Sequence, residues 1–238
     1  MLKIIPAGDA AVIIKAGDDI SPDTNMKVRQ IMQAMEKIDL PGIMEMVPSY
    51  NELMIYYQPG VIDFHQMTGY IRKAESKMES MPAPSAKRVY VPVCYGSEEG
   101  PDLELVANTN SLSKEQVIEL HTNSNLLIYM LGFSPGFCYL GGMNPRISCP
   151  RKTSPRLDIP AGSVGIAGNQ TGIYPISSPG GWQIIGHTPL LPFTPNAEEP
   201  FLFKAGDRIR FFEIDREEHN HIKSLINEGR YEIRKEQI

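Results

Sequence analysis

Hydrophobic residues in the first eighty positions alternate between strand-like runs and a helix-like spacing. The segments "AAVIIKAG", "GIMEMV" and "NELMIYY" are short apolar runs that predict strands. After the first of these, Ser21 and Pro22 precede apolar positions three and four residues apart, which predicts a helix. A second helix is predicted from Asp63, because Gln66 three residues later completes a capping-box pattern. This order indicates an α+β domain of the split β-α-β, ferredoxin-like kind.

The pattern changes across residues 76–88, where apolar periodicity ends and Pro and Ser gather. Such a segment is typical of a linker, so we predict two domains, 1–82 and 83–238. In the second domain "RVYVPV" predicts a strand, "PDLELVANTN" predicts a short helix, and Ser113 begins another helix. Short apolar runs between Gly and Pro follow, among them "LLIYMLGF", "GSVGIAG", "TGIYPI", "WQIIGHT" and "DRIRFFEI". They predict a β-barrel or β-sandwich, followed by a last helix that begins after Asp215.

Composition narrows the class of protein. A hydrophobic fraction of 42% with 21% charged residues is that of a globular chain, and 238 residues can bury a core. The net charge of −5 argues against a nucleic-acid or membrane-surface protein, because phosphate binding needs clustered Lys and Arg. No apolar run reaches the roughly 20 residues of a membrane span, and the N-terminus does not have the pattern of a leader. We therefore expect a cytoplasmic protein.

Several common chemical signatures are absent. The three cysteines, Cys94, Cys138 and Cys149, show no C-x-x-C spacing, so we expect reduced thiols and no metal site. The chain also lacks a Walker loop, a G-x-G-x-x-G fingerprint, H-E-x-x-H and G-x-S-x-G. Any catalytic site must therefore be built from less specific patterns.

The candidate chemistry lies in side chains embedded among Gly and Pro. His121 follows Val117 by four residues, which places it on the inward face of its predicted helix. The pattern favours a buried, hydrogen-bonded histidine; the alternative is a proton carrier, since the free pKa of His lies near neutrality. In "GFSPGFCYLGG" three aromatic residues are either core packing or the walls of a pocket: Phe133, Phe137 and Tyr139.

The next segments add charge and neutral polar groups. Arg151 and Arg156 lie five residues apart in a Pro-rich stretch, where they either grip a carboxylate or phosphate or form ordinary surface salt bridges. Hydrogen-bonding groups follow near glycines, which let a ligand approach the backbone: Asn169, Gln170, Tyr174 and Ser178. Trp182 comes directly after Pro-Gly-Gly and either plugs a turn or lines a pocket, of which we favour the pocket.

At these segments the sequence resembles a known family. The stretches "YMLGFSPGFCYLGGM", "PRKTSPRLDIPAGSVGIAGNQTGIYPISSPGGWQIIGHTP", "YGSEEGPDLELVA" and "IELH" look like the KipI family, which includes allophanate hydrolase subunit 1 and the B subunit of 5-oxoprolinase. The resemblance runs through the whole chain. It implies an α+β N-terminal domain followed by a mainly-β, cyclophilin-like barrel.

The resemblance also implies a function. Family members work with a KipA-type subunit, and with a LamB/YcsF-type subunit they form an ATP-dependent 5-oxoprolinase that opens 5-oxo-L-proline to L-glutamate. The expected cofactor is ATP, as Mg-ATP, in a site shared with a partner subunit. Two alternatives remain open at this point: inhibition of the sporulation histidine kinase KinA, and a carboxyltransferase-type role on urea-like or allophanate-like amides.

Within that function the residues take expected roles. Arg151 and Arg156 would supply positive charge to an anionic ring and a nearby phosphoryl group. Asn169, Gln170 and Tyr174 would orient the ring, and His121 would carry a proton. One position departs from the family pattern, because His187 stands where we expect Arg in "WQLIGRTP". A titratable group there makes a cationic role pH-dependent or leaves the position a bystander.

Overall fold

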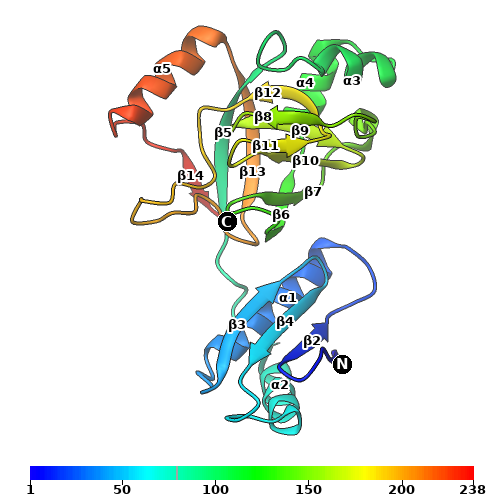
Figure 1. The fold of residues 1–238 in the computed structure, drawn as a ribbon, viewed down its shortest axis with the longest axis vertical. Helices are drawn as coiled ribbons and strands as arrows, with labels where there is room; N and C mark the ends of the chain where they lie inside the picture. The colour runs from blue at the N-terminus through cyan, green and yellow to red at the C-terminus, as the bar shows by residue number, and fades with distance from the viewer. Residues whose placement is uncertain (79) are drawn as a thin grey trace. The chain divides into compact units, whose positions relative to one another are not determined.

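The computed structural model describes residues 1–78 and 80–238 and divides the chain into two compact units, Met1–Ser85 and Ala86–Ile238. Figure 1 draws the first unit in blue and cyan and the second from green to red. In the described part of the chain, every helix is too short or too polar to span a membrane. Each unit has its own hydrophobic core.

The first unit is a four-stranded antiparallel sheet with two helices. Its elements in chain order are β1 (Lys3–Pro6), β2 (Ala11–Lys15), α1 (Pro22–Glu36), β3 (Ile43–Pro48), β4 (Glu52–Tyr57) and α2 (Phe64–Met78). The strand order is β1-β2-β4-β3, so β4 lies between the two strands that α1 connects. The edge strand beyond β2 is β1, which the sequence pattern did not indicate. The ferredoxin-like classification of this unit stays a prediction.

Both helices begin where the sequence predicts. The Ser21 hydroxyl accepts a hydrogen bond from the Thr24 amide at the start of α1, and Asp63 and Gln66 exchange backbone and side-chain bonds at the start of α2. One stripe of each helix is buried against one face of the sheet. The shared core contains Val28, Ile31 and Met35 of α1, Met67, Ile71 and Ala74 of α2, and Val12, Ile14, Leu53 and Ile55 of the strands.

The second unit is built around an eight-stranded sheet. Its helices are α3 (Leu103–Thr109), α4 (Lys114–Thr122), the short 3-10 helix η1 (Pro145–Ile147) and α5 (Arg216–Asn227). Its strands are β5 (Lys87–Tyr95), β6 (Leu126–Leu131), β7 (Cys138–Gly141), β8 (Arg156–Ile159), β9 (Ser163–Ala167), β10 (Gln170–Ile173), β11 (Ser178–Gly180), β12 (Gln183–His187), β13 (Arg208–Ile214) and β14 (Lys235–Gln237). Most of these strands are only three to five residues long.

The large sheet curls into a nearly closed barrel. The order is β10-β9-β12-β5-β13-β6-β7, with β14 added beside β5, and the end strands β7 and β10 contact each other. The pair β5–β13 is parallel, whereas the other described pairs of this sheet are antiparallel. The barrel interior holds Val91, Ile128, Leu140, Ile166 and Phe211, all at 1% exposure or less. Of the two architectures that the sequence allowed, the structure has the barrel.

A separate two-stranded ribbon, β8–β11, carries Arg156 and Ser178, two of the candidate residues in the sequence.

Within the described residues, the longer predicted strands and all five α-helices are present where the sequence placed them. The sequence pattern did not indicate β1, β7, β8, β11 or β14. Each of these strands has three or four residues, which is too short for apolar alternation to stand out.

Candidate functional site

A small pocket gathers most of the aromatic residues singled out from the sequence. Its walls include Phe133, Phe137, Tyr139, Tyr174 and Trp182, and Arg151 is its charged member. The cavity volume is about 230 Å³. The aromatic residues come from the β6–β7 loop, from β7, from the position directly after β10 and from the position directly before β12, so four parts of the second unit build it. We call this cavity the aromatic pocket.

The rings of the aromatic pocket form one edge-to-face cluster centred on Phe137. Its ring centroid lies 5.1 Å from Tyr139, 5.6 Å from Trp182 and 6.2 Å from Tyr174, with interplanar angles of 71°, 88° and 80°. Tyr174 and Trp182 also meet edge to face, at 6.3 Å. This is the geometry that ring quadrupoles favour, and it holds the pocket walls in fixed orientations. Trp182 is therefore largely buried and lines the cavity as well.

The glycines after Pro179 have a steric role. A Cβ atom on Gly180 would overlap the Tyr174 hydroxyl oxygen, so only glycine lets this ring approach the β11 backbone. Burial raises the pKa of the Tyr174 hydroxyl, which therefore stays protonated and can donate a hydrogen bond at neutral pH. The Pro-Gly-Gly turn thus positions a polar donor at the pocket wall.

Phe133 stands at the mouth of the pocket in an unusual conformation. Its φ is 65°, in the left-handed region that bulky residues rarely adopt, and its side chain is 75% exposed. The next turn is held by bonds from Ser134 N to the Gly132 carbonyl and from Phe137 N to the Ser134 carbonyl. Local backbone strain of this kind is concentrated at functional sites in proteins, so it supports the assignment of the pocket as the candidate site.

The two predicted arginines do not act as a pair. Arg156 donates to the Asp102 carboxylate at 2.8 Å and to the Trp182 carbonyl at 3.4 Å, and it lines a different cavity. Asp102 is 6% exposed and also accepts the Ile184 amide at 2.7 Å. Burial acts to raise the pKa of Asp102, but the bonds from Arg156 and Ile184 outweigh it and hold the pKa below its ordinary value. Arg156 thus holds the Trp182 backbone and does not line the aromatic pocket. Arg151 is therefore the cation of the pocket.

His121 lies in the barrel core instead of the pocket. Its ring is fully buried and stacks on Phe211 at 4.7 Å. Thr171 donates its hydroxyl to the Gly165 carbonyl, so it accepts from His121 Nε2, and the Tyr95 hydroxyl then donates to Nδ1. Burial lowers the pKa of His121 to about 3. The ring is therefore neutral near pH 7 and has both nitrogens bonded, as the favoured interpretation of the sequence expects.

The other predicted polar residues are placed outside the pocket wall. Asn169 is exposed in the turn between β9 and β10, and Gln170 begins β10. Ser178 begins β11 and pairs with Ile159 in the two-stranded ribbon. Tyr174 is therefore the member of this predicted group that the structure brings to the pocket.

His187 takes part in an arrangement that the sequence did not reveal. Its Nε2 donates to the Ala161 carbonyl at 2.9 Å, and its Nδ1 lies 2.9 Å from Nε2 of His219 in α5. Burial lowers the pKa of His187, so the ring is mostly neutral and accepts from His219. His187 therefore holds α5 against β12 and lines two other cavities. It does not replace a cation in the aromatic pocket.

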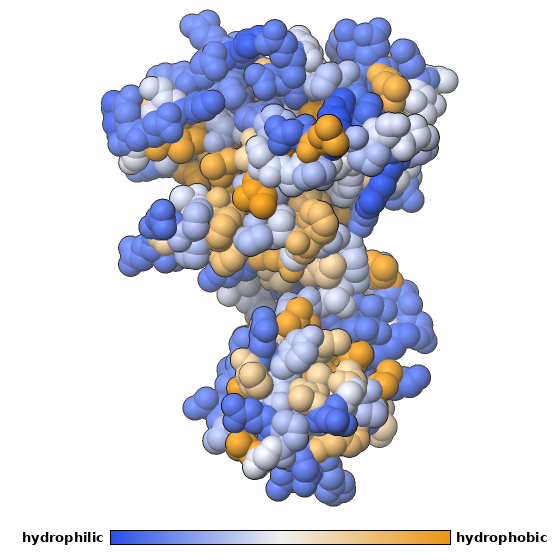
Figure 2. All heavy atoms as spheres, viewed as in Figure 1, coloured by the Kyte–Doolittle hydropathy of each residue, from blue (hydrophilic) through white to orange (hydrophobic). Residues whose placement is uncertain are grey.

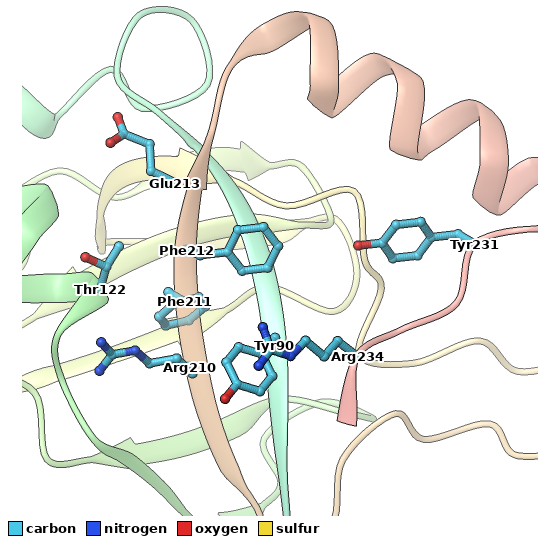
Figure 3. Close-up of a pocket in the computed structure, with 8 residues that line it drawn as sticks. All are labelled: Tyr90, Thr122, Arg210, Phe211, Phe212, Glu213, Tyr231 and Arg234. Atoms are coloured by element: carbon cyan, nitrogen blue, oxygen red, sulfur yellow. The ribbon is translucent and has the colours of Figure 1, made fainter. Parts of the chain in front are cut away.

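Larger hollows exist elsewhere on the second unit. One of about 720 Å³ lies between α5 and the segment after β12. Another, of about 440 Å³, is the groove in Figure 3, where Phe212 points from β13 toward Tyr231 and Arg234 reaches over Tyr90. Arg234 lies 3.9 Å above that ring and pairs with Glu236, while Arg210 bonds to Asn123. Apart from His187, which lines the first of them, neither hollow is lined by a residue singled out from the sequence.

The aromatic pocket suits a small anionic ring. One guanidinium, apolar ring faces and a tyrosine donor can hold a carboxylate, a hydrocarbon edge and a carbonyl oxygen. The pocket does not fit Mg-ATP, because its volume lies below the roughly 300–1,000 Å³ of pockets that hold drug-sized ligands, and its described lining contains no carboxylate to hold magnesium. Among the described residues no group of three or more His, Cys, Asp or Glu could bind a metal ion.

Comparison with known proteins identifies the family. Residues 2–203 match the family described as "Carboxyltransferase domain, subdomain C and D". The chain belongs to this family. A curated member of similar length, the B subunit of 5-oxoprolinase from Bacillus subtilis, is 44% identical over 94% of this chain and 98% of its own length. The Escherichia coli O157:H7 protein of the same name is 38% identical over 86% of this chain and 92% of its own length.

Solved structures agree with the family assignment. The crystal structure of TTHA0988 superposes with a TM-score of 0.75 at 34% identity, over 86% of this chain and 39% of that longer chain. The Kluyveromyces lactis urea amidolyase superposes with a TM-score of 0.79 at 18% identity, over 100% of this chain and 16% of its own. The second likeness shows the carboxyltransferase-type fold alone. Because the curated relatives are named as one subunit of 5-oxoprolinase, other subunits accompany them in an enzyme complex.

Proposed function

We propose that this chain is the B-type subunit of a 5-oxoprolinase that opens 5-oxo-L-proline to L-glutamate together with KipA-type and LamB/YcsF-type subunits. The observation that carries the proposal is the 44% identity, over 94% of this chain, to a curated 5-oxoprolinase subunit of the same type. The aromatic pocket supports it independently, because its size and lining suit a five-membered ring that bears one carboxylate. We further assign the second unit to the cyclophilin-like barrels and the protein to the cytoplasm.

The aromatic pocket would bind the substrate in one orientation. The Arg151 guanidinium faces the carboxylate of 5-oxoproline, because a planar fork matches a carboxylate in two parallel hydrogen bonds. The ring methylenes lie against Phe137 and Trp182, and the Tyr174 hydroxyl donates to the lactam carbonyl. A donor on that oxygen stabilises the negative charge that develops when the amide is attacked.

Chemistry beyond binding would come from the assembled enzyme. His121 is buried and bonded at both nitrogens, so it is not poised to move a proton in the pocket. The described lining of the pocket contains no carboxylate, cysteine or histidine. We therefore propose that ATP and the activating groups are held by the partner subunits and that this chain holds the lactam ring.

Reconstitution tests the proposed function. The chain is co-expressed with its KipA-type and LamB/YcsF-type partners, and ATP-dependent release of glutamate from 5-oxoproline is measured. Omission of this chain should reduce the activity to background. Equal activity with and without the chain would refute the assignment.

A second candidate function is carboxyl transfer to a urea-like amide, because the family is described by a carboxyltransferase domain and the fold is shared with a urea amidolyase. Transfer of the carboxyl group from the carboxylated biotin of a carrier protein to urea, with release of free biotin on the carrier, discriminates between the two. The oxoprolinase assignment predicts no such transfer.

A further inference from the structure

The sheet of the first unit has one face that none of the unit's described elements covers. The helices α1 and α2 pack against the face that carries Val12, Ile14, Leu53 and Ile55, and Figure 1 shows α1 behind the strands. Successive side chains of a strand point to opposite faces, so the alternate residues of each strand form a second, outer face. On this outer face Ile5, Ile13 and Met54 are partly exposed, and Val47 is 37% exposed.

The outer face carries a continuous apolar row. The strand register pairs Ile5 with Ile13, Ile13 with Met54, and Met54 with Val47, so one row crosses all four strands. Tyr56, at 40% exposure, lies next to this row along β4. Antiparallel sheets with one solvated face normally carry polar residues there. Figure 2 shows hydrophobic residues gathered over the strands of this unit, so the face has the character of an interface.

Charges beside the row decide what would cover it. Lys15 of β2 pairs in register with Glu52 of β4, next to the pair Ile13 and Met54 on the same face. A two-fold axis parallel to the strands and between β2 and β4 brings β2 of one copy over β4 of another. Lys15 then faces Glu52 of the second copy, and Ile13 faces its Met54. The face is complementary to itself in charge and in apolar character, as a two-fold interface requires.

We propose that the outer face of the first unit, along the row Ile5–Ile13–Met54–Val47, binds a second copy of this chain face to face. Two sheets packed in this way lie about 10 Å apart with their inner side chains interdigitated. Lys15 bonds Asp18 at 2.7 Å, but the Asp18 side chain is 98% exposed, so this pair is weak and leaves Lys15 able to change partner. The surface shares no residue with the aromatic pocket, and the inference stands apart from the proposed function.

Charge-reversal variants of the full chain test the interface by sedimentation velocity. Wild type should dimerise, and Lys15→Glu or Glu52→Lys alone should weaken self-association by about tenfold or more, because each places two pairs of like charges across the two-fold axis. An equimolar mixture of the two single variants should form a heterodimer, since every cross-copy pair is then opposite in charge. The double variant K15E/E52K should dimerise like wild type.

The matched control is Lys73→Glu, the same charge change on the exposed side of α2, which should leave the dimer intact. Rescue in the mixture distinguishes a lost contact from a misfolded unit, because two misfolded chains would not restore each other. A monomeric wild type, dimeric single variants, or failure of the mixture to associate would each overturn the proposal. If wild type is monomeric and the single variants no longer bind the other enzyme components, the face has a different occupant and the proposal is overturned as well.

Discussion

At the scale of single residues, the aromatic pocket depends on an ion pair that does not line it. Asp102 holds Arg156 and the Ile184 amide, and Arg156 contacts the Trp182 carbonyl, so one buried carboxylate fixes the start of β12 behind the indole. From the sequence, Arg156 was expected to bind the ligand. Spacing along the chain does not reveal that its partner is the Asp102 carboxylate, fifty-four positions away. The signal that the sequence did offer was an acidic residue, Asp102, at the start of a predicted short helix.

Asp102→Asn should lower the free energy of unfolding by about 2 kcal/mol near pH 7, because Arg156 loses a charged, largely buried partner. The pKa of Asp102 is below 3.8 in the folded protein, so its stabilisation is fully present above the unfolded pKa and is lost as pH falls through the folded pKa. Urea unfolding at several pH values should therefore show the two proteins converge in acid. A constant difference at all pH values would contradict the ion-pair role.

His121 should make stability depend on pH in the same direction for a different reason. Burial lowers its pKa from 6.5 to about 3, so its neutral form stabilises the fold above pH 6.5 and this contribution is lost as pH falls toward 3. Relative to His121→Gln, wild type should lose roughly 3 kcal/mol of unfolding free energy between pH 7 and about pH 4. Parallel stability profiles for the two proteins would show that His121 titrates normally.

At the scale of elements, helices and long strands were predictable from the sequence and the short strands were not. Capping residues such as Ser113 and Asp215 mark helix starts through local hydrogen bonds that the sequence displays. Strands such as β7, β8 and β11 exist because a neighbouring strand pairs with them, and that pairing is not local. The same limit explains why Asn169 and Ser178 were grouped with Tyr174, although the fold separates them.

Gly180→Ala should displace the Tyr174 ring, because the added methyl group overlaps its hydroxyl oxygen and the aromatic cluster leaves that ring little room. The expected result is a loss of about 1–3 kcal/mol in unfolding free energy and a change in the fluorescence of Trp182, which lies 6.3 Å from Tyr174 between ring centroids. An unchanged emission spectrum with unchanged stability would argue against the close approach.

Gly69→Ala, in α2, should raise the free energy of unfolding, whereas Gly180→Ala should lower it. Gly69 lies inside the helix, and a Cβ there would have nothing within 4 Å, so alanine adds helix propensity without a clash. The variant should gain about 0.5–1 kcal/mol in chemical denaturation. Destabilisation would mean that the exposed side of α2 is packed against something in solution.

At the scale of the whole molecule, the pocket agrees with the role of one subunit in a larger enzyme, as the chain's curated relatives are named. The aromatic pocket offers a cation and a donor but no described group that moves a proton or holds magnesium. The sequence could predict this pocket's aromatic walls and, through the family motifs, the kind of complex. It favoured a buried His121, but it could not predict that Arg156 serves the fold, because that role depends on a contact between distant segments.

The measurement that tests the central claim most directly is the kinetics of Arg151→Gln in the reconstituted enzyme. If Arg151 binds the substrate carboxylate, the KM for 5-oxoproline should rise about tenfold or more, since a hydrogen bond to a charged group contributes about 1.5–3 kcal/mol. The KM for ATP should stay unchanged. Arg146→Gln, at an exposed arginine outside the pocket, should behave as wild type. Unchanged KM for 5-oxoproline in Arg151→Gln would contradict the assignment of the aromatic pocket.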